Sequence, residues 1–335
     1  MTSVTCPIGV VVVAFNASDV IVGCIESLLA QSAGRPKIVV VDNASTDDTV
    51  PVIRKWAAKN PDVALREFAS GERPALDEAG DVALLHSTAN TGFAGGVNLG
   101  LALLAGMPEI GHFWVLNPDA FADAGATGAI MAAAAVTPGY GLMGGRVCYA
   151  DPKTRIQIDG GTINRWTGVS SNVNLGRDAD KTALPGADQL DFITGASMVA
   201  SRRFYESVGP MREDYFLYYE EADWAMRRAA LCRWSWRRVW WSITTPCISS
   251  PAGPDGSPFS FWFRSIAGEP CSSAASIHHA GDAGLFRRQG GADPAEGAQP
   301  QAVALVRGAL CCRPEGGARP AVARSAEDRL WPVIE

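Results

Sequence analysis

Acidic residues in the stretch REDYFLYYEEADWAMRR, residues 212–228, could carry out proton transfer. Glu220, Glu221 and Asp223 begin a helical pattern there. Acidic side chains in a first helical turn interact favourably with the helix dipole, by about 0.3–1 kcal/mol each, which is a purely structural reason for them. The dipole does not explain the aromatic residues just before them, which are Tyr215, Phe216, Tyr218 and Tyr219. Aromatic neighbours can desolvate a carboxylate and raise its pKa, as a general base requires, and aromatic faces suit stacking against sugars.

A second candidate group is the stretch WVLNPDA, residues 114–120, in which an apolar run leads into Asn117, Pro118 and Asp119. One carboxylate can hold a Mg²⁺ or Mn²⁺ ion whose other ligands are phosphate oxygens and water, and such an ion neutralises a nucleotide diphosphate. A type I turn with Asn first and Pro second explains the same residues without any ligand. The residues alone leave both interpretations open.

Polar residues also follow other apolar runs. In VVVDNASTDDT, residues 39–49, Asp42 could accept hydrogen bonds from a ligand, whereas residues 45–48 are better explained as helix caps. In NTGFAGGVNLGL, residues 90–101, glycines would let the backbone approach a phosphate beside a helix N-terminus. This pattern is neither a dinucleotide fingerprint nor a P-loop, and an ordinary strand-to-helix turn explains it equally well.

These groups must be positioned by the strands and helices that alternate between residues 8 and 229. Buried strands are predicted at 9–15, 37–41, 81–85 and 111–116. Helices are predicted from Ser18, from Ser45 to Trp56, over 97–104 and from Glu220. This alternation predicts an α/β fold with a mostly parallel sheet and helices on both faces. Such sheets bind ligands outside the carboxyl ends of their strands, where the polar residues described above would meet.

The composition of the chain argues against several classes of protein. The chain has 335 residues, 47% of them hydrophobic, and a formal net charge of −6, which argues against a nucleic-acid-binding surface. No apolar run reaches the roughly 18–20 residues of a membrane span, and no basic segment precedes the first apolar run as in a signal peptide. We therefore expect a cytoplasmic protein. The eight cysteines form no paired C-x-x-C pattern, so neither a zinc site nor a disulfide framework is expected.

The character of the sequence changes near residue 230. The last lysine is Lys181, and beyond residue 229 the chain is rich in Arg, Pro, Gly, Ser, Cys and Trp, with low-complexity sequence over 287–335. A divergent C-terminal domain and a shifted reading frame in a GC-rich gene both explain this composition. We therefore expect a folded domain over residues 1–229 and an anomalous region over residues 230–335.

Taken in order, several stretches resemble the family 2 glycosyltransferases of the GT-A fold, and most closely the bacterial rhamnosyltransferase-like enzymes of cell-surface polysaccharide assembly. They are VVVAFN (11–16), VVVDNASTDDT (39–49), NTGFAGGVNLG (90–100), WVLNPDA (114–120) and the long stretch from Phe192 to Arg228. The resemblance covers about residues 8–229. It implies a Rossmann-like, mostly parallel sheet with flanking helices, followed by an irregular C-terminal tail.

The resemblance also implies roles for individual residues. Asp119 matches the metal ligand of the family's DxD-type motif, and Glu221 stands where the family has its catalytic Asp, one methylene longer here. Glu220 and Asp223 complete the acidic catalytic group. The residues implied in nucleotide-sugar binding are Phe15, Asn16, Asp42, Asn43, Gly92, Phe93, Asn98, Asn117, Gly195 and Ala196.

The implied reaction is inverting, metal-dependent transfer of rhamnose or a similar hexose. The donor would be a dTDP- or UDP-sugar with Mg²⁺ or Mn²⁺, and the acceptor a saccharide or lipid-linked saccharide, reached by weak peripheral association at the inner face of the plasma membrane. The chain departs from the family after the acidic helix, because residues 230–260 lack the usual His. A defective remnant that only binds nucleotide is therefore the alternative. A sugar-nucleotide-forming nucleotidyltransferase is disfavoured, since no Gly-rich loop with Arg or Lys follows the first strand.

Overall fold

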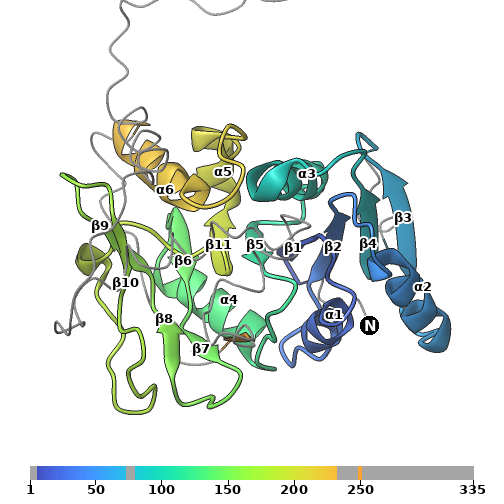
Figure 1. Ribbon diagram of the computed structural model, residues 1–335, viewed down its shortest axis with the longest axis horizontal. Helices are drawn as coiled ribbons and strands as arrows, with labels where there is room; N and C mark the ends of the chain where they lie inside the picture. Colours follow the sequence, from blue (N-terminus) through green and yellow to red (C-terminus); the bar gives the residue numbers. More distant parts are fainter. Residues whose placement is uncertain (1–5, 73–79, 232–247, 251–335) are drawn as a thin grey trace, which may run out of the picture. The chain divides into compact units, whose positions relative to one another are not determined.

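A computed structural model of the chain describes residues 6–72, 80–231 and 248–250. Contacts divide the chain into two units, and the second has four described residues, Arg165–Gly168. The first unit is built on a seven-stranded sheet in the order β3-β4-β2-β1-β5-β11-β6 (Figure 1). Its strands are β1 (Ile8–Ala14), β2 (Lys37–Asp42), β3 (Leu65–Ala69), β4 (Val82–His86), β5 (His112–Leu116), β6 (Leu142–Gly144) and β11 (Ser197–Ser201).

The sheet is parallel from β3 through β5, and β11 then runs antiparallel to both β5 and β6. The central strands consist largely of β-branched and apolar residues because both of their faces are buried. In β1, Val11 and Val13 pack into one core cluster, whereas Val10 and Val12 pack into the other. The structure therefore confirms the predicted α/β class with a mostly parallel sheet.

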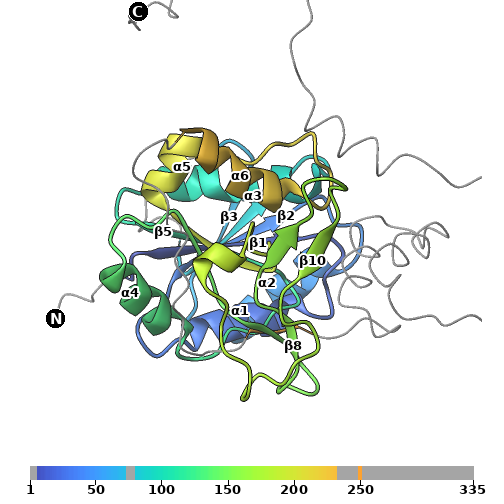
Figure 2. The same cartoon turned by 90° about the vertical axis from the view of Figure 1, so that its left-hand side faces the viewer.

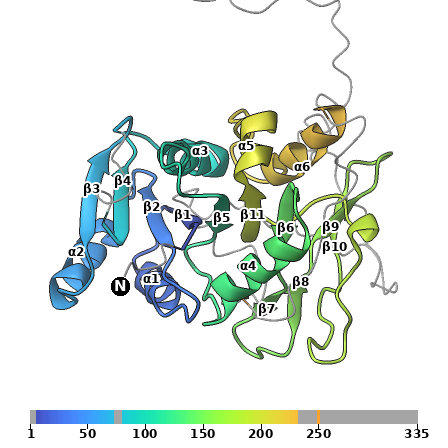
Figure 3. The same ribbon diagram turned by 180° about the vertical axis from the view of Figure 1, so that it is seen from behind.

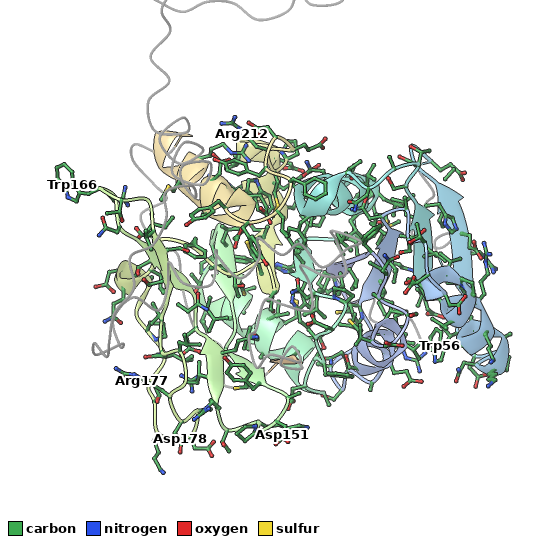
Figure 4. The ribbon with its side chains drawn as sticks, in the orientation of Figure 1. Trp56, Asp151, Trp166, Arg177, Asp178 and Arg212 are labelled. Carbon is green, nitrogen blue, oxygen red and sulfur yellow. The ribbon has the colours of Figure 1, made fainter. Side chains whose placement is uncertain are left out.

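Helices cover both faces of the sheet (Figures 2 and 3). One face carries α3 (Gly92–Ala105), α5 (Arg202–Val208) and α6 (Glu220–Leu231), and the other carries α1 (Ile21–Leu29), α2 (Thr49–Lys59) and α4 (Ala126–Val136). On the second face, Trp56 of α2 donates its indole N–H to Glu26 of α1 at 2.9 Å (Figure 4). Among the described helices, none has the length and apolar character needed to cross a bilayer.

Short strands between β6 and β11 extend the first unit. They are β7 (Val147–Tyr149), β8 (Ile156–Ile158), β9 (Gly161–Ile163) and β10 (Ser170–Asn172), with a 3₁₀ turn at Ala187–Gln189. A bidentate ion pair fixes this region, since Arg146 donates to both oxygens of the fully buried Asp159 at 2.9 and 2.8 Å. The short strand β12 (Ile248–Ser250) pairs with β7.

Some local expectations need correction. Strand β3 was not predicted. It is an edge strand, and its exposed charged residues Arg66 and Glu67 interrupt the apolar pattern by which a strand is recognised. Helix α3 begins at Gly92 rather than near residue 97, so the predicted glycine loop is the first turn of a helix. Cys148 is disulfide-bonded, whereas the cysteine spacing indicated no disulfide framework. Most of the anomalous region 230–335 also lies outside the described residues, and its boundary stays a prediction.

Candidate active site at the carboxyl edge of the sheet

The predicted polar residues gather at one edge because the strand register aligns them. Asp42 ends β2 opposite Ala14 of β1 and His86 of β4. Asn117 directly follows β5, and its backbone N–H donates to Ala196, just before β11, at 3.1 Å. The carboxyl ends of β1, β2, β4 and β5 therefore meet the start of β11 along one edge of the sheet.

Two asparagines fix the loops at this edge. Asn16, which has a positive φ of 51°, accepts hydrogen bonds through Oδ1 from the backbone of Thr46 at 2.8 Å and of Asp47 at 3.3 Å. The fully buried Asn43 donates through Nδ2 to Asn90 and to the carbonyl of Gly92, both at 3.0 Å. Its Oδ1 accepts from the backbone and side chain of Thr91, both at 3.1 Å. The loop after β1 is thus tied to the loop after β2, and the loop after β2 to the start of α3.

Glycines at the start of α3 and before β11 allow close packing. Gly92 has a φ of +73°, and a Cβ there would lie 2.3 Å from the carbonyl oxygen of Phe216. The next residue, Phe93, donates its backbone N–H to that same carbonyl at 3.0 Å. A Cβ on Gly195 would lie 3.0 Å from the Phe93 ring. The approach at Gly92 requires glycine and the one at Gly195 is tight, and the first turn of α3 is packed against the loop that leads into α6.

The carboxylate groups of the acidic pair at the start of α6 are buried, although Glu221 as a whole residue is only half-buried. Glu220 is 3% exposed, and one carboxylate oxygen of Glu220 and one of Glu221 (Oε2 in each) have no hydrogen-bond partner among the described residues. The backbone enters this helix through Tyr218 and Tyr219, whose φ angles are +70° and +71°. Such left-handed conformations cost roughly 1–2 kcal/mol per non-glycine residue, so the surrounding contacts must hold the acidic pair in place.

Burial changes the ionisation of both acids. It raises the pKa of Glu221 to about 7, although backbone N–H groups, including that of Gly195, partly offset this effect. Burial, together with the nearby charge of Glu221, raises the pKa of Glu220 well above its usual value of 4.5. The pair can therefore exchange a proton with a ligand near neutral pH, which is what general-base catalysis requires.

The NPD segment forms the turn that its sequence predicts, because the N–H of Ala120 donates to the carbonyl of Asn117 at 3.2 Å. Asp119 is only 1% exposed, and the Cys24 thiol of α1 donates to the Asn117 carbonyl at 3.5 Å. Burial, and secondarily the charge of Asp119, raise the pKa of Cys24. The segment thus lies between α1 and the ends of β5 and β11.

Comparison with known proteins identifies the family. The family model described as "Glycosyl transferase family 2" matches residues 9–183, which is just over half of the chain. This chain belongs to glycosyl transferase family 2. The match ends before α6, so the roles of Glu220 and Glu221 rest on their geometry.

One curated relative of this family 2 chain is the low-salt glycan biosynthesis hexosyltransferase Agl10 of Haloferax volcanii, 23% identical over 209 residues. The alignment covers 61% of this chain and 56% of that protein, so the chain spans little more than half of the relative's length. Similar solved structures include a mannosyltransferase of Pyrobaculum calidifontis with GDP-Man and Mn²⁺, at 19% identity and a TM-score of 0.47 over 75% of this chain and 58% of that one. Another is S. aureus TarS 1–349 with UDP-GlcNAc, at 12% identity and a TM-score of 0.48 over 81% and 63%.

Within this family 2 domain, several residues that were predicted to contact the nucleotide-sugar make contacts within the protein. Phe15 is a buried core residue, and Asn43 has all of its amide hydrogen-bonding capacity taken up by the start of α3. Asn98 donates to the Met211 carbonyl and to Glu213, both at 2.9 Å, and is buried. These side chains stabilise the loops around the site, and their predicted contact with a ligand stays a prediction. Sequence spacing could not separate the two roles, because an asparagine beside a loop suits both.

Asp223, which was predicted to belong to the acidic catalytic group, forms an ion pair within α6. Its carboxylate pairs with Arg227 at 2.8 Å, one helical turn later, and Arg227 in turn donates to the carbonyls of Val208 and Pro210. The carboxylate therefore fixes α6 to the end of α5. Arg212, in the loop before α6, pairs with Asp214 and lies over the ring of Tyr215 (Figure 4).

The chemistry of the NPD segment fits a hard cation. Asp119 supplies a carboxylate oxygen, which Mg²⁺ and Mn²⁺ prefer, at the edge where a diphosphate would bind. The described residues contain no group of three or more His, Cys, Asp or Glu side chains that could hold a metal alone. Phosphate oxygens and water would therefore have to complete the coordination. Because Asp119 is 1% exposed, its turn must also shift before a phosphate-bound ion can reach the carboxylate.

The Asn98 contacts give a testable stability prediction. Asn98→Ala leaves the buried backbone groups of Met211 without their partners, which costs about 2–4 kcal/mol of unfolding free energy for two lost hydrogen bonds. Urea denaturation measures this loss. The matched control is Asn60→Ala, because the Asn60 side chain donates only to the Trp56 carbonyl at the end of α2. We expect that variant to lose less than about 1 kcal/mol. Equal losses in the two variants would contradict a supporting role for Asn98.

Proposed function

We propose that this chain transfers a hexose, rhamnose or a similar sugar, from a nucleotide-diphosphate donor to a hydroxyl of a saccharide or lipid-linked saccharide. The single observation that carries the proposal is the buried acidic pair, whose orphaned carboxylate oxygens lie at the edge where family 2 strand ends converge. A buried carboxylate oxygen without a hydrogen-bond partner destabilises the folded protein. Its presence is best explained by a ligand that hydrogen-bonds to it. The family match and the hexosyltransferase relative support the same reaction class.

The proposed chemistry is an in-line displacement with inversion. Glu221 removes the proton from an acceptor hydroxyl, and that oxygen forms a bond to the anomeric carbon of the donor sugar. The bond from the anomeric carbon to the diphosphate oxygen breaks, and the nucleoside diphosphate leaves with the electron pair. The N–H of Gly195, which donates to the Glu221 carboxylate, holds this base beside the start of β11. The proton stays on Glu221 until solvent removes it.

The donor side of the proposal rests on Asp42 and Asp119. Asp42 keeps one oxygen engaged with the Ser45 N–H at 3.1 Å, which leaves the other for the base or ribose. Asp119 would hold a Mg²⁺ or Mn²⁺ ion, which when bound neutralises the charge of the leaving diphosphate. A lipid-linked acceptor would place the reaction at the inner face of the plasma membrane, in the assembly of cell-surface polysaccharide.

Nucleotide binding and turnover test the proposal directly. Calorimetry with UDP, dTDP and GDP, each with Mn²⁺, is expected to show binding that Asp42→Asn weakens about 10–100-fold, since a hydrogen bond to a charged group contributes about 1.5–3 kcal/mol. The control is Asp48→Asn, an exposed acid on the same loop. Absence of binding would reject the proposal. Binding without turnover of any hexose donor, with saccharide acceptors present, would instead favour the catalytically defective remnant.

A further inference from the structure

One side of α1 contacts the backbone of the segment that carries Asp119. Cys24 and Ser27 lie one turn apart in α1, and Gln31 follows just after the helix ends. Residues three apart in a helix share a face, and the side chain of Gln31 stays beside that face because its Nε2 donates to the Ser27 carbonyl at 3.0 Å. These three side chains all form hydrogen bonds with the backbone of residues 117–127.

The hydroxyl of Ser27 holds the backbone three residues after Asp119. It accepts from the N–H of Ala122 at 3.0 Å and donates to the carbonyl of Cys24 at 2.7 Å. Because the donated hydrogen bond goes to its own helix, the hydroxyl proton points away and a lone pair faces Ala122. Ala122 is buried, so the loss of this acceptor would destabilise the segment.

The side chain of Gln31 holds the same segment further along the chain. This buried amide donates to the Asp123 carbonyl at 2.8 Å and accepts through Oε1 from the N–H of Thr127 at 2.9 Å. Thr127 lies in the first turn of α4, where the N-cap residue, Gly125, has no side chain that could accept this hydrogen bond. Gln31 therefore supplies the missing acceptor and joins the end of α1 to the start of α4 on the same face of the sheet (Figure 3).

These contacts leave a short piece of chain around Asp119 between two held points. Upstream, the N–H of Asn117 donates to the backbone just before β11 at 3.1 Å. Downstream, Ser27 holds Ala122. The shift that exposes the buried carboxylate therefore falls on residues 118–121. A short loop held at both ends has few conformations, so less conformational entropy is lost when a ligand orders it.

We propose that Ser27 and Gln31 are positioning residues for the metal ligand Asp119. They hold the downstream end of its turn, so that the carboxylate is presented in one orientation to a phosphate-bound Mg²⁺ or Mn²⁺ ion. The inference rests on the proposed metal role of Asp119 and extends it to residues that act through Asp119 and do not touch the ion. When these hydrogen bonds are lost, the turn takes more conformations, so affinity for the ion falls while nucleotide binding without metal does not.

Electron paramagnetic resonance of Mn²⁺, titrated into the full chain saturated with UDP, tests this role. Ser27→Ala is expected to weaken Mn²⁺ binding about 3–10-fold, which is the effect of one neutral hydrogen bond, and to broaden the spectrum of the bound ion. Calorimetry is expected to show UDP affinity without metal within about twofold of wild type, because no contact to the nucleotide is lost. Ser27→Thr keeps a hydroxyl that can donate to the carbonyl three residues earlier, and it is expected to restore wild-type Mn²⁺ binding. Gln31→Met keeps the length of the side chain without its hydrogen bonds and is expected to weaken Mn²⁺ binding at least as much as Ser27→Ala.

The matched control is Glu26→Ala, which removes a hydrogen bond from α1 to Trp56 rather than to the Asp119 segment. Urea denaturation is expected to show a loss of stability in this variant, with Mn²⁺ binding unchanged. If Glu26→Ala weakens Mn²⁺ binding as much as Ser27→Ala does, the effect is only a loss of stability and the inference is overturned. It is also overturned if Ser27→Ala and Gln31→Met bind Mn²⁺ as wild type does, or if metal-free UDP affinity falls in parallel.

Failure of the underlying proposal gives a different result. If Mn²⁺ binds the UDP complexes of wild type and Asp119→Asn equally, the metal role of Asp119 is rejected, and this inference with it. If wild type binds no nucleoside diphosphate, the proposed function itself is rejected. In contrast, normal Mn²⁺ binding in Ser27→Ala and Gln31→Met, together with its loss in Asp119→Asn, rejects the positioning role alone.

Discussion

Glu221→Gln is expected to lower the rate of sugar transfer about 10²–10⁴-fold and, at pH 8, to make the protein more stable than wild type. The loss of activity follows because an amide cannot accept the acceptor's proton. The gain in stability follows because burial raises the pKa of Glu221 to about 7, from an ordinary value of 4.5. Ionising this side chain above pH 7 therefore costs the folded state free energy that the neutral amide does not cost.

The pH dependence of this effect has a definite sign. The folded protein holds the Glu221 proton more tightly than the unfolded chain, so stability falls as the pH rises from about 4.5 to about 7 and then levels off. Below this window the acid is neutral in both states, and the variant has no advantage. We expect a difference on the order of 1–3 kcal/mol at pH 8 and almost none at pH 4. In wild type, kcat/KM should rise with pH up to about 7.

Urea denaturation at the two pH values, together with transfer assays across the pH range, measures both effects. The matched control is Glu109→Gln, an exposed acid away from the strand ends, which should change neither activity nor the pH dependence of stability. A Glu221→Gln variant that remained active, or that lost stability at pH 8, would show that this carboxylate is not the buried base.

Asp119→Asn is expected to abolish the part of nucleoside diphosphate affinity that depends on Mn²⁺ and to slow transfer about 10²–10³-fold. The physical reason is that the amide keeps the shape of the turn but removes the negative oxygen that a divalent cation needs. Losing a group that stabilises the charge of the leaving diphosphate costs about 2.7–4 kcal/mol in comparable electrostatic sites, which corresponds to that rate loss.

Calorimetry with UDP, with and without Mn²⁺, separates the metal effect from a folding defect. Asp123→Asn is the matched control, because Asp123 lies on the same loop, is exposed and uses its carboxylate to accept a local hydrogen bond from Gly125. The metal role fails if Mn²⁺ strengthens UDP binding equally in wild type and in Asp119→Asn. It also fails if Asp123→Asn loses as much affinity as Asp119→Asn.

The sequence predicts β1, β2, β4 and β5 and the edge of the sheet where they end, because uninterrupted β-branched runs have few other structural explanations. The helical start of α6 and the turn at Asn117 were also predictable from local residue types. Strand β3 was not, because an edge strand with two adjacent exposed charges, Arg66 and Glu67, resembles a loop. The structural roles of the individual asparagines could not be predicted either, because the hydrogen-bond partners of Asn98 lie 113 and 115 residues further along the chain.

The position of His86 beside Asp42 was not predicted, for a related reason. Its environment comes from Glu67 and Asp42, which lie on neighbouring strands, and no local motif joins them. The only sequence signal was its position at the end of a buried strand, next to Asp42 in a parallel sheet. In contrast, the buried acids of α6 could be found from the sequence, because the acids and their aromatic neighbours are contiguous.

The close contact between Gly92 and the Phe216 carbonyl limits how enzymes of this kind can be recombined. The loop that leads into α6 packs against the first turn of α3, which lies more than a hundred residues earlier in the chain. A chimera that imports an acceptor-side loop from a relative must therefore bring the matching glycine turn with it, as the two segments form a single interlocking unit. Engineering that treats donor and acceptor halves as separate modules would divide this chain at the wrong place.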